Sequence, residues 1–262
     1  MEQIIKALPL VLALCVSLPA DLALLAGNMQ PADDSNLSAD QKGKYRHDSN
    51  RLALRDMLRG SEGAASQVQI RKNLAEAYYH GLIHIHNATH LAASRTVVAY
   101  GIHTAAWPAM QRLLISLHPE TPWLLRWRMG RLATGNPDID GVLEDNGFVL
   151  RELYEMEEGD YIAVLEAAQP LNLFPVAERL EQNKYILKTE LSGGPEGGNN
   201  ITGLRGPESF EYAFTLAWPD IQGGYTNRHY FVFAVKLDGS VKVISQGGDP
   251  LSAFAGVMDA SW

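Results

Sequence analysis

The spacing of apolar and polar positions changes along this chain. One continuous apolar block covers residues 7–20, and residues 28–50 are polar with almost no large apolar side chain. After them, apolar residues recur at helical or strand spacing, which is typical of a folded body. The pattern predicts a signal peptide over residues 1–26 and a flexible polar linker over residues 27–50, because the linker has little to bury.

An N-terminal helix and strand region is predicted over residues 51–110. A short helical pattern ends at Gly60, and a longer one covers residues 68–85. In the longer pattern, residues from Leu74 onward recur at i, i+4, i+7, i+8 and i+11, the spacing of one buried helical face. Residues 96–103 contain several β-branched residues and favour a strand.

The clearest architectural signal lies in residues 111–191. An Asn-Pro pair at 136–137 is typical of a helix start, and the turn-rich residues 157–160 join two strand patterns. The predicted elements are a strand (112–117), a helix (136–146), two strands (148–154 and 161–165), a helix (172–180) and a strand (185–189). The order β-α-β-β-α-β predicts a ferredoxin-like unit, in which an antiparallel sheet carries both helices on one face.

A Gly-rich and Pro-containing linker is predicted over residues 191–206, and an antiparallel β-meander over residues 207–262. Asp238-Gly239 favours a two-residue hairpin turn inside the meander. The predicted fold class is therefore α+β: a ferredoxin-like unit with an N-terminal helical segment and a C-terminal meander.

Composition and charge narrow the classes of function. A hydrophobic fraction of 46% with 20% charged residues is ordinary for a globular protein. The net charge of −8 argues against a nucleic-acid partner. The single cysteine, Cys15, lies in the leader, so the folded part is expected to have no internal disulfide, thiolate metal site or thiol nucleophile.

The leader predicts export to the periplasm or medium. Lys6 precedes an apolar run of the length of a secretory core, which is too short to span a bilayer. Two alternatives stay open: an uncleaved anchor reaching Ala26, and lipid modification of Cys15, which the large residue Leu14 disfavours. Membrane contact is expected only through such an anchor.

Residues 136–189, with Pro-Leu-Asn at 170–172, resemble the propeptide and inhibitor domains of subtilisin-type proteases. No protease domain follows them in this sequence, which differs from a true propeptide. The resemblance implies a secreted protease as partner and places the binding segment directly after the last strand. The candidate binding residues are Glu190, Leu191 and Ser192.

A wider resemblance runs through Ala-Tyr-Tyr at 77–79, Thr-Gly-Asn at 134–136 and residues 218–230. It is to a family of uncharacterised exported bacterial proteins whose meander carries Trp-Gly-Asp-Cys-Pro-x-Gly-Cys before Arg-His or Arg-Tyr. Ile221 and Tyr225 occupy the two cysteine positions here. Joint loss of both cysteines is what a structural disulfide predicts.

Four histidines, at positions 80, 84, 86 and 90, are spaced closely enough to suggest a metal site. On a helix, His80 and His84 share a face while His86 and His90 point nearly opposite, so only the first two are candidates. The alternative is a pair of solvated or core-edge histidines, because the Glu of zinc proteases is missing between them. If the helix ended before His84, then His84 and His86 would share a strand face.

Asp220, Arg228 and His229 are the candidate catalytic residues, as acid, anion clamp and base. The alternative is that ion pairs and hydrogen bonds of these residues shape the meander loop. His103 and Thr104 are interpreted as a packed strand end, since no paired carboxylate can be placed beside them from the sequence. No phosphate-loop, dinucleotide or calcium motif occurs, so no cofactor is predicted.

The leading hypothesis is an exported, non-catalytic module that binds a protein or has a structural role. The first alternative is a propeptide-like inhibitor or folding helper of a subtilisin-type protease. The second is an unrecognised hydrolase that uses Asp220 and His229.

Overall fold

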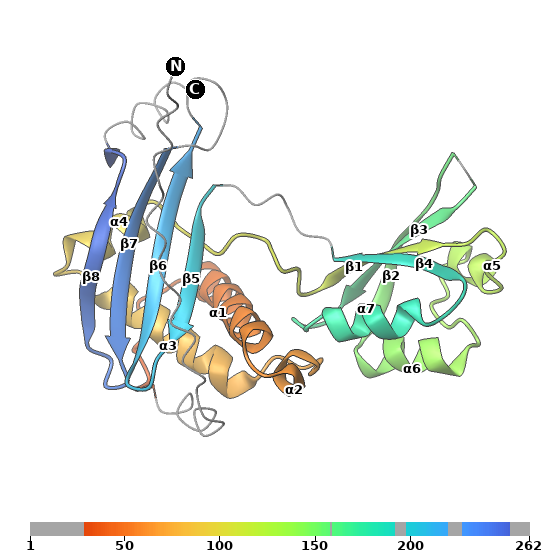
Figure 1. Ribbon diagram of the computed structural model, residues 1–262, viewed down its shortest axis with the longest axis horizontal. Helices are drawn as coiled ribbons and strands as arrows, with labels where there is room; N and C mark the ends of the chain where they lie inside the picture. Colours follow the sequence, from red (N-terminus) through yellow and green to blue (C-terminus); the bar gives the residue numbers. More distant parts are fainter. Residues whose placement is uncertain (1–28, 158, 192–197, 220–226, 252–262) are drawn as a thin grey trace, which may run out of the picture.

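The computed structural model describes residues 29–157, 159–191, 198–219 and 227–251. These residues form two lobes, each built on one four-stranded antiparallel sheet (Figure 1). The mixture of helices and antiparallel sheets confirms the predicted α+β class. The predicted signal peptide lies outside the described residues. Among the helices that are described, none combines the length and apolarity needed to cross a membrane.

The first lobe combines the two ends of the described chain. Its strands form a meander in the order β5-β6-β7-β8, and the amino-terminal helices lie against one face of that sheet (Figure 1). The helices against the sheet are α1 (Ala39–Arg59), α3 (Lys72–Asn87) and α4 (Ala92–Ala99). The four-residue α2 (Glu62–Ala65) follows α1 on the side of the second lobe. The strands are β5 (Asn200–Arg205), β6 (Ser209–Trp218), β7 (Asn227–Lys236) and β8 (Val241–Gly248). Residues predicted as separate regions therefore share one hydrophobic core.

Tyr78 of α3 and Tyr212 of β6 form the centre of this core. Both rings are fully buried, and they meet edge to face with centroids 5.9 Å apart. The Tyr212 hydroxyl donates to the Tyr78 carbonyl at 3.3 Å. A side chain at Gly81 would overlap that hydroxyl, so the close approach of helix and strand requires glycine at this position.

The second lobe has its strands in the order β2-β3-β1-β4. Alternate residues of β1 and β3 are fully buried against the helices, which lie on one face of the sheet (Figure 1). The predicted order of strands and helices is present, with one extra short helix, α5. The elements are β1 (Arg112–Leu117), α5 (Leu124–Arg128), α6 (Pro137–Asp145), β2 (Phe148–Glu155), β3 (Tyr161–Ala167), α7 (Phe174–Glu181) and β4 (Ile186–Leu191).

The predicted flexible linker is wrong throughout its described part: Met29 and Leu37 are buried, and α1 begins at Ala39, with Ser38 as its N-cap. The Ser38 side chain accepts from the Gln41 backbone N–H at 3.2 Å, and the Gln41 side chain accepts from the Ser38 N–H at 2.9 Å. This reciprocal pair is a capping box. The buried face of α1 begins with polar residues such as Asp48 and Arg51, so hydrophobic spacing could not reveal the start of this helix.

The predicted strand at residues 96–103 is also wrong, because its first half lies in α4 and its second half belongs to no strand. Val97 is buried in the first core against α3, and this tertiary packing overrides the β preference of its side chain. The helix is short and ends at Ala99, with Tyr100 as its C-cap.

The predicted linker at residues 191–206 contains a strand, β5, that pairs with β6. Only Ile201 and Gly203 of β5 are buried, and Gly203 lies against the Tyr78 ring. The pairing partner is supplied by β6, so the strand is specified by its neighbour more than by its own residues.

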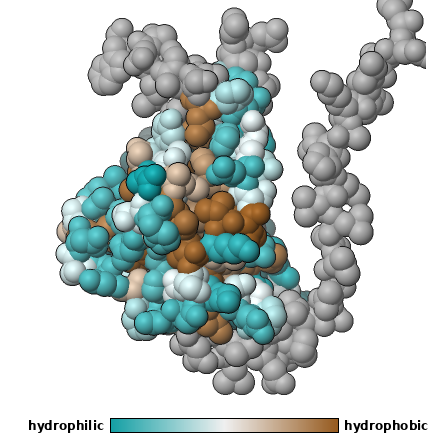
Figure 2. Space-filling view, turned by 90° about the vertical axis from the view of Figure 1, so that its left-hand side faces the viewer, coloured by the Kyte–Doolittle hydropathy of each residue, from teal (hydrophilic) through white to brown (hydrophobic). Residues whose placement is uncertain are grey.

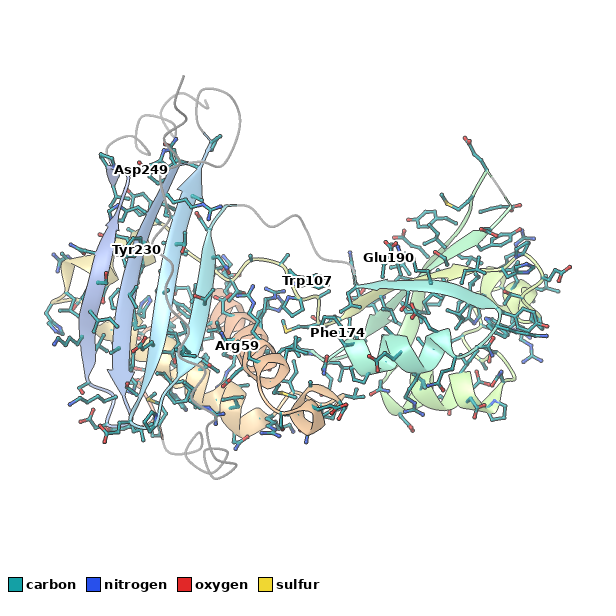
Figure 3. All side chains as sticks on the ribbon, viewed as in Figure 1. Arg59, Trp107, Phe174, Glu190, Tyr230 and Asp249 are labelled. Carbon is teal, nitrogen blue, oxygen red and sulfur yellow. The ribbon has the colours of Figure 1, made fainter. Side chains whose placement is uncertain are left out.

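Asn172 joins the two lobes. Its side-chain amide donates to the carbonyls of Ala65 and Gln67, at 2.6 and 3.0 Å, and its backbone N–H donates to Val68 at 2.8 Å. Close by, Trp107 of the connecting segment and Phe174 of α7 meet edge to face with centroids 5.9 Å apart (Figure 3). The lobes are therefore held by hydrogen bonds to fixed backbone groups as well as by an aromatic contact.

We expect Asn172→Ala to lower the free energy of unfolding by about 1–2 kcal/mol, because two partly buried carbonyls lose the hydrogen bonds of the fully buried Asn172 amide. Asn183→Ala is the matched control. The Asn183 side chain accepts from the Tyr185 backbone N–H at 3.0 Å, as Asn172 accepts from the Phe174 N–H at 3.3 Å, but the hydrogen bonds that the structure describes for Asn183 stay within the second lobe. Chemical denaturation measures both losses. Equal losses for the two variants would contradict the special role of Asn172.

Candidate functional site

A buried carboxylate holds a histidine in the segment that follows α4. Asp48, 2% exposed, lies 2.6 Å from His103 through its Oδ2 and the ring Nδ1. Its Oδ1 accepts from the Thr104 backbone N–H at 2.9 Å and from the Thr104 hydroxyl at 2.7 Å. The carboxylate thus fixes the histidine ring through Nδ1 and leaves Nε2 as the nitrogen for another partner.

Arg51, one turn along α1 from Asp48, completes the polar cluster. Its guanidinium donates to the Thr104 hydroxyl at 2.9 Å, to His47 Nε2 at 2.9 Å and to the Pro108 carbonyl at 3.2 Å. Because Thr104 receives a hydrogen from Arg51, its own hydroxyl hydrogen is directed to Asp48. The cluster therefore supplies the buried carboxylate with donors and a nearby positive charge.

A cavity of about 170 Å³ adjoins His103, between α1, α3, α4 and β6. Its apolar wall consists of Leu82, Ile85, Val97, Val98, Ile102 and Phe214. Its polar wall consists of Gln41, Lys44, Tyr45, His86 and His103. A wider groove along α1 shares Lys44 and His103 with the cavity, so these two residues border both spaces.

Tyr45 and His86 form a second polar pair on the cavity wall. The tyrosine hydroxyl lies 2.9 Å from His86 Nδ1. Burial, helped by the charge of Asp48, raises the pKa of Tyr45 to about 12, so the hydroxyl keeps its hydrogen. Burial also lowers the pKa of His86. This wall can therefore bind a polar group through neutral donors and acceptors, while the opposite wall holds an apolar body.

A shallower hollow lies between the start of α4 and the edge strand β8. Figure 2 shows apolar side chains gathered on this side of the first lobe. The hollow is lined by Leu91, Ala92, Ala93, Val243 and Ile244, with Ser245 and Gln246 at its polar end. It contains no titratable side chain in its lining, so we place the candidate site at the cavity beside His103.

His80 and His84, the candidate metal ligands, hold the segment that precedes α1. His80 Nδ1 accepts from the Ala32 N–H at 3.2 Å, and His84 Nε2 donates to the Gln30 carbonyl at 2.8 Å. They lie on one face of α3, which continues past both, so the strand alternative for His84 is wrong. Among the described residues, no group of three or more His, Cys, Asp or Glu could hold a metal ion.

The candidate catalytic residues lie at the start of β7, except Asp220, which lies outside the described residues. The Arg228 backbone N–H donates to Asp249 Oδ2 at 2.8 Å, and His229 Nδ1 donates to the Asp249 carbonyl at 2.8 Å. Asp249 lies at the end of the sheet (Figure 3). Arg228 and His229 thus tie β7 to the residue after β8, which is the structural alternative for these residues.

Glu190 and Leu191, the candidate binding residues, end β4, and Ser192 lies outside the described residues (Figure 3). The Glu190 carboxylate binds the Lys188 ammonium group. Glu190 also faces Leu114 across the sheet, on the side away from the helices. Glu190 therefore lies on the solvent-exposed face of the second sheet, whereas Leu191 pairs with the buried Leu113 and packs against the second core.

Asp48 is the site residue that sequence reasoning missed. It lies 55 positions from His103, in a stretch that composition assigns to a linker. The available signal was the capping pattern that starts α1, which would have placed Asp48 on a helix. Comparison with models of protein families, with curated proteins and with solved structures finds no match. The geometry of the site therefore carries the functional argument.

We expect the free energy of unfolding to fall as the pH drops below about 7. Burial lowers the pKa of His80 and of His86 below the ordinary 6.5, so the unfolded chain binds more protons in that window. Each histidine can change the free energy of unfolding by at most about 1.4 kcal/mol per pH unit. Denaturation between pH 5 and 8 measures it.

Replacing both histidines by Gln should reduce this dependence and leave the part that comes from His47, whose pKa is also lowered by burial and by the charge of Arg51. His90→Gln should leave the dependence unchanged, because His90 is exposed. An unchanged pH dependence in the double variant would show that other groups cause the acid sensitivity.

Proposed function

We propose that the protein is an exported, non-catalytic binding module that holds a small ligand in the cavity beside His103. The proposal keeps the export and the binding role expected from the sequence, and changes the bound species from a protein to a small molecule. One observation carries it: a histidine held by the buried Asp48 borders a cavity that has one apolar and one polar wall.

The size of the cavity supports a ligand of one ring. Its volume of about 170 Å³ is close to that of an engineered cavity of about 150 Å³ that binds benzene. Ligand sites combine an apolar lining with a few polar groups that fix the orientation of the ligand. The cavity has this composition, with Tyr45, His86 and His103 among its polar groups.

We expect Val98→Phe to abolish binding of ring-sized probes such as benzyl alcohol, because the half-buried Val98 lines the cavity and a larger ring would fill it. In the unchanged protein, a probe at ten times its Kd should add about 1.4 kcal/mol to the free energy of unfolding. Thermal unfolding with and without the probe measures this.

Val149→Phe is the matched control, because Val149 is 44% exposed on the second lobe. It should leave the probe effect intact. The ligand-binding function would be wrong if millimolar probes stabilised none of the three proteins, or all three equally.

A second candidate function is protein binding through the exposed face of the sheet in the second lobe. Leu114, Ile162 and Val164 are half-buried there, at positions that alternate with fully buried core residues. Tyr154, 50% exposed, pairs with Ile162 at the edge of this apolar strip. The resemblance to protease propeptides favours a secreted subtilisin-type protease as partner, with Glu190 and the following residues near its cleft.

If this face binds such a protease, the full chain should inhibit it at micromolar concentration, and Ile162→Lys should weaken inhibition at least roughly tenfold by placing a charge in the contact. Val232→Lys is the control, since Val232 is half-buried on the other sheet. Residual activity across a panel of subtilisin-type proteases measures the effect. No inhibition of any of them would remove this candidate.

A further inference from the structure

We propose that the cavity beside His103 binds a compact carboxylate: one ring, or a short branched chain, that carries a single carboxylate group paired with the His103 ring. This inference rests on the proposed ligand-binding function and adds the chemical class of the ligand. It starts from the shape of the apolar wall and from the groups on the polar wall.

The apolar wall limits the size of the ligand. Leu82, Ile85 and Phe214 are at most 3% exposed and belong to the first core, so the wall is fixed by packing. At about 170 Å³, the space matches one six-membered ring with a small substituent. Nucleotides, oligosaccharides and peptides are larger than this volume.

The polar wall presents mainly hydrogen-bond donors. Lys44 carries three N–H groups, and its ion pair with Asp40 at 2.9 Å occupies one of them. When the Tyr45 hydroxyl donates to His86 Nδ1, the neutral His86 ring carries its own hydrogen on Nε2. Asp48 borders the neighbouring groove, but its oxygens are engaged by His103 and Thr104. This wall favours an anion over a cation.

His103 supplies the pairing group. Its Nδ1 is bonded to Asp48, so its Nε2 is the nitrogen that can contact the ligand. When a carboxylate ligand is bound, the protonated His103 ring lies between two negative groups. Its Nδ1–H donates to Asp48, and its Nε2–H donates to the ligand. The proton on Nε2 comes from the ligand when it enters as the acid, and from solvent when it enters as the anion.

The pairing makes binding depend on pH. Benzoate affinity should fall as the pH rises, since the His103 ring must hold two hydrogens to pair with the anion. The other titratable groups around His103 are Asp40, Lys44, Tyr45, His47 and Asp48 on α1 and His86 on α3. The experiment therefore needs His103→Gln, which separates the contribution of His103 to the pH dependence of binding from the contributions of these groups.

The experiment compares benzoate with its neutral analogue benzamide by calorimetry on the full chain. In the unchanged protein, benzoate should bind at least roughly tenfold more tightly at pH 6, the size expected for a hydrogen bond between charged groups. Titrations in buffers of different ionisation enthalpy should show proton uptake with benzoate as the pH rises.

His103→Gln should weaken benzoate binding at least roughly tenfold, remove the proton uptake and leave benzamide affinity within about threefold. His103 has a side chain 36% exposed, so the variant is expected to fold, and circular dichroism checks this. His90→Gln is the matched control, because His90 is exposed and does not line the cavity.

The outcomes separate the two levels of the argument. If benzamide binds as tightly as benzoate and His103→Gln changes neither, the cavity binds small molecules but the carboxylate assignment is overturned. If neither compound nor benzyl alcohol binds the unchanged protein at millimolar concentration, the proposed function fails and the inference fails with it.

Discussion

The first lobe depends on packing between two pieces of chain that are distant in the sequence. The contact between Tyr78 and Tyr212 joins positions 134 residues apart. It lies at the centre of the core that α1 and α3 share with the sheet β5-β6-β7-β8. The whole second lobe, from β1 to β4, lies between these two pieces. It is therefore an insertion into a domain whose core can form only when both ends of the chain come together.

The cluster around Asp48 lies where that insertion leaves the first lobe. Arg51 binds the Pro108 carbonyl, and Arg55 binds the Trp107 carbonyl, so α1 holds the segment that leads into β1. The same segment carries His103 on the wall of the cavity. One set of hydrogen bonds thus fixes both the connection between the lobes and the position of the ring that borders the proposed site. A buried carboxylate is tolerated here because the connecting segment supplies its donors.

The second lobe was predictable from the sequence, and the first lobe only in part. The helix capped by Asn136, with Pro137 at its first position, and the alternation along β3 are local signals that burial in the second core reinforces. In the first lobe, α3 and the meander strands carry such signals, but α1 and β5 do not. The buried face of α1 begins with Asp48, Ser49 and Arg51, so its periodicity is not one of hydrophobicity.

The candidate site was missed for the same physical reason. His103 was visible in the sequence, but its value as a site depends on a carboxylate 55 residues away in a stretch that composition assigns to solvent. Low hydrophobicity indicates disorder only when the polar residues have no partners inside the protein. Asp48, Arg51 and Thr104 are partners of one another, and together they convert a polar stretch into a buried helical face. A residue whose role depends on long-range polar pairing is therefore hidden from any argument based on local hydrophobicity.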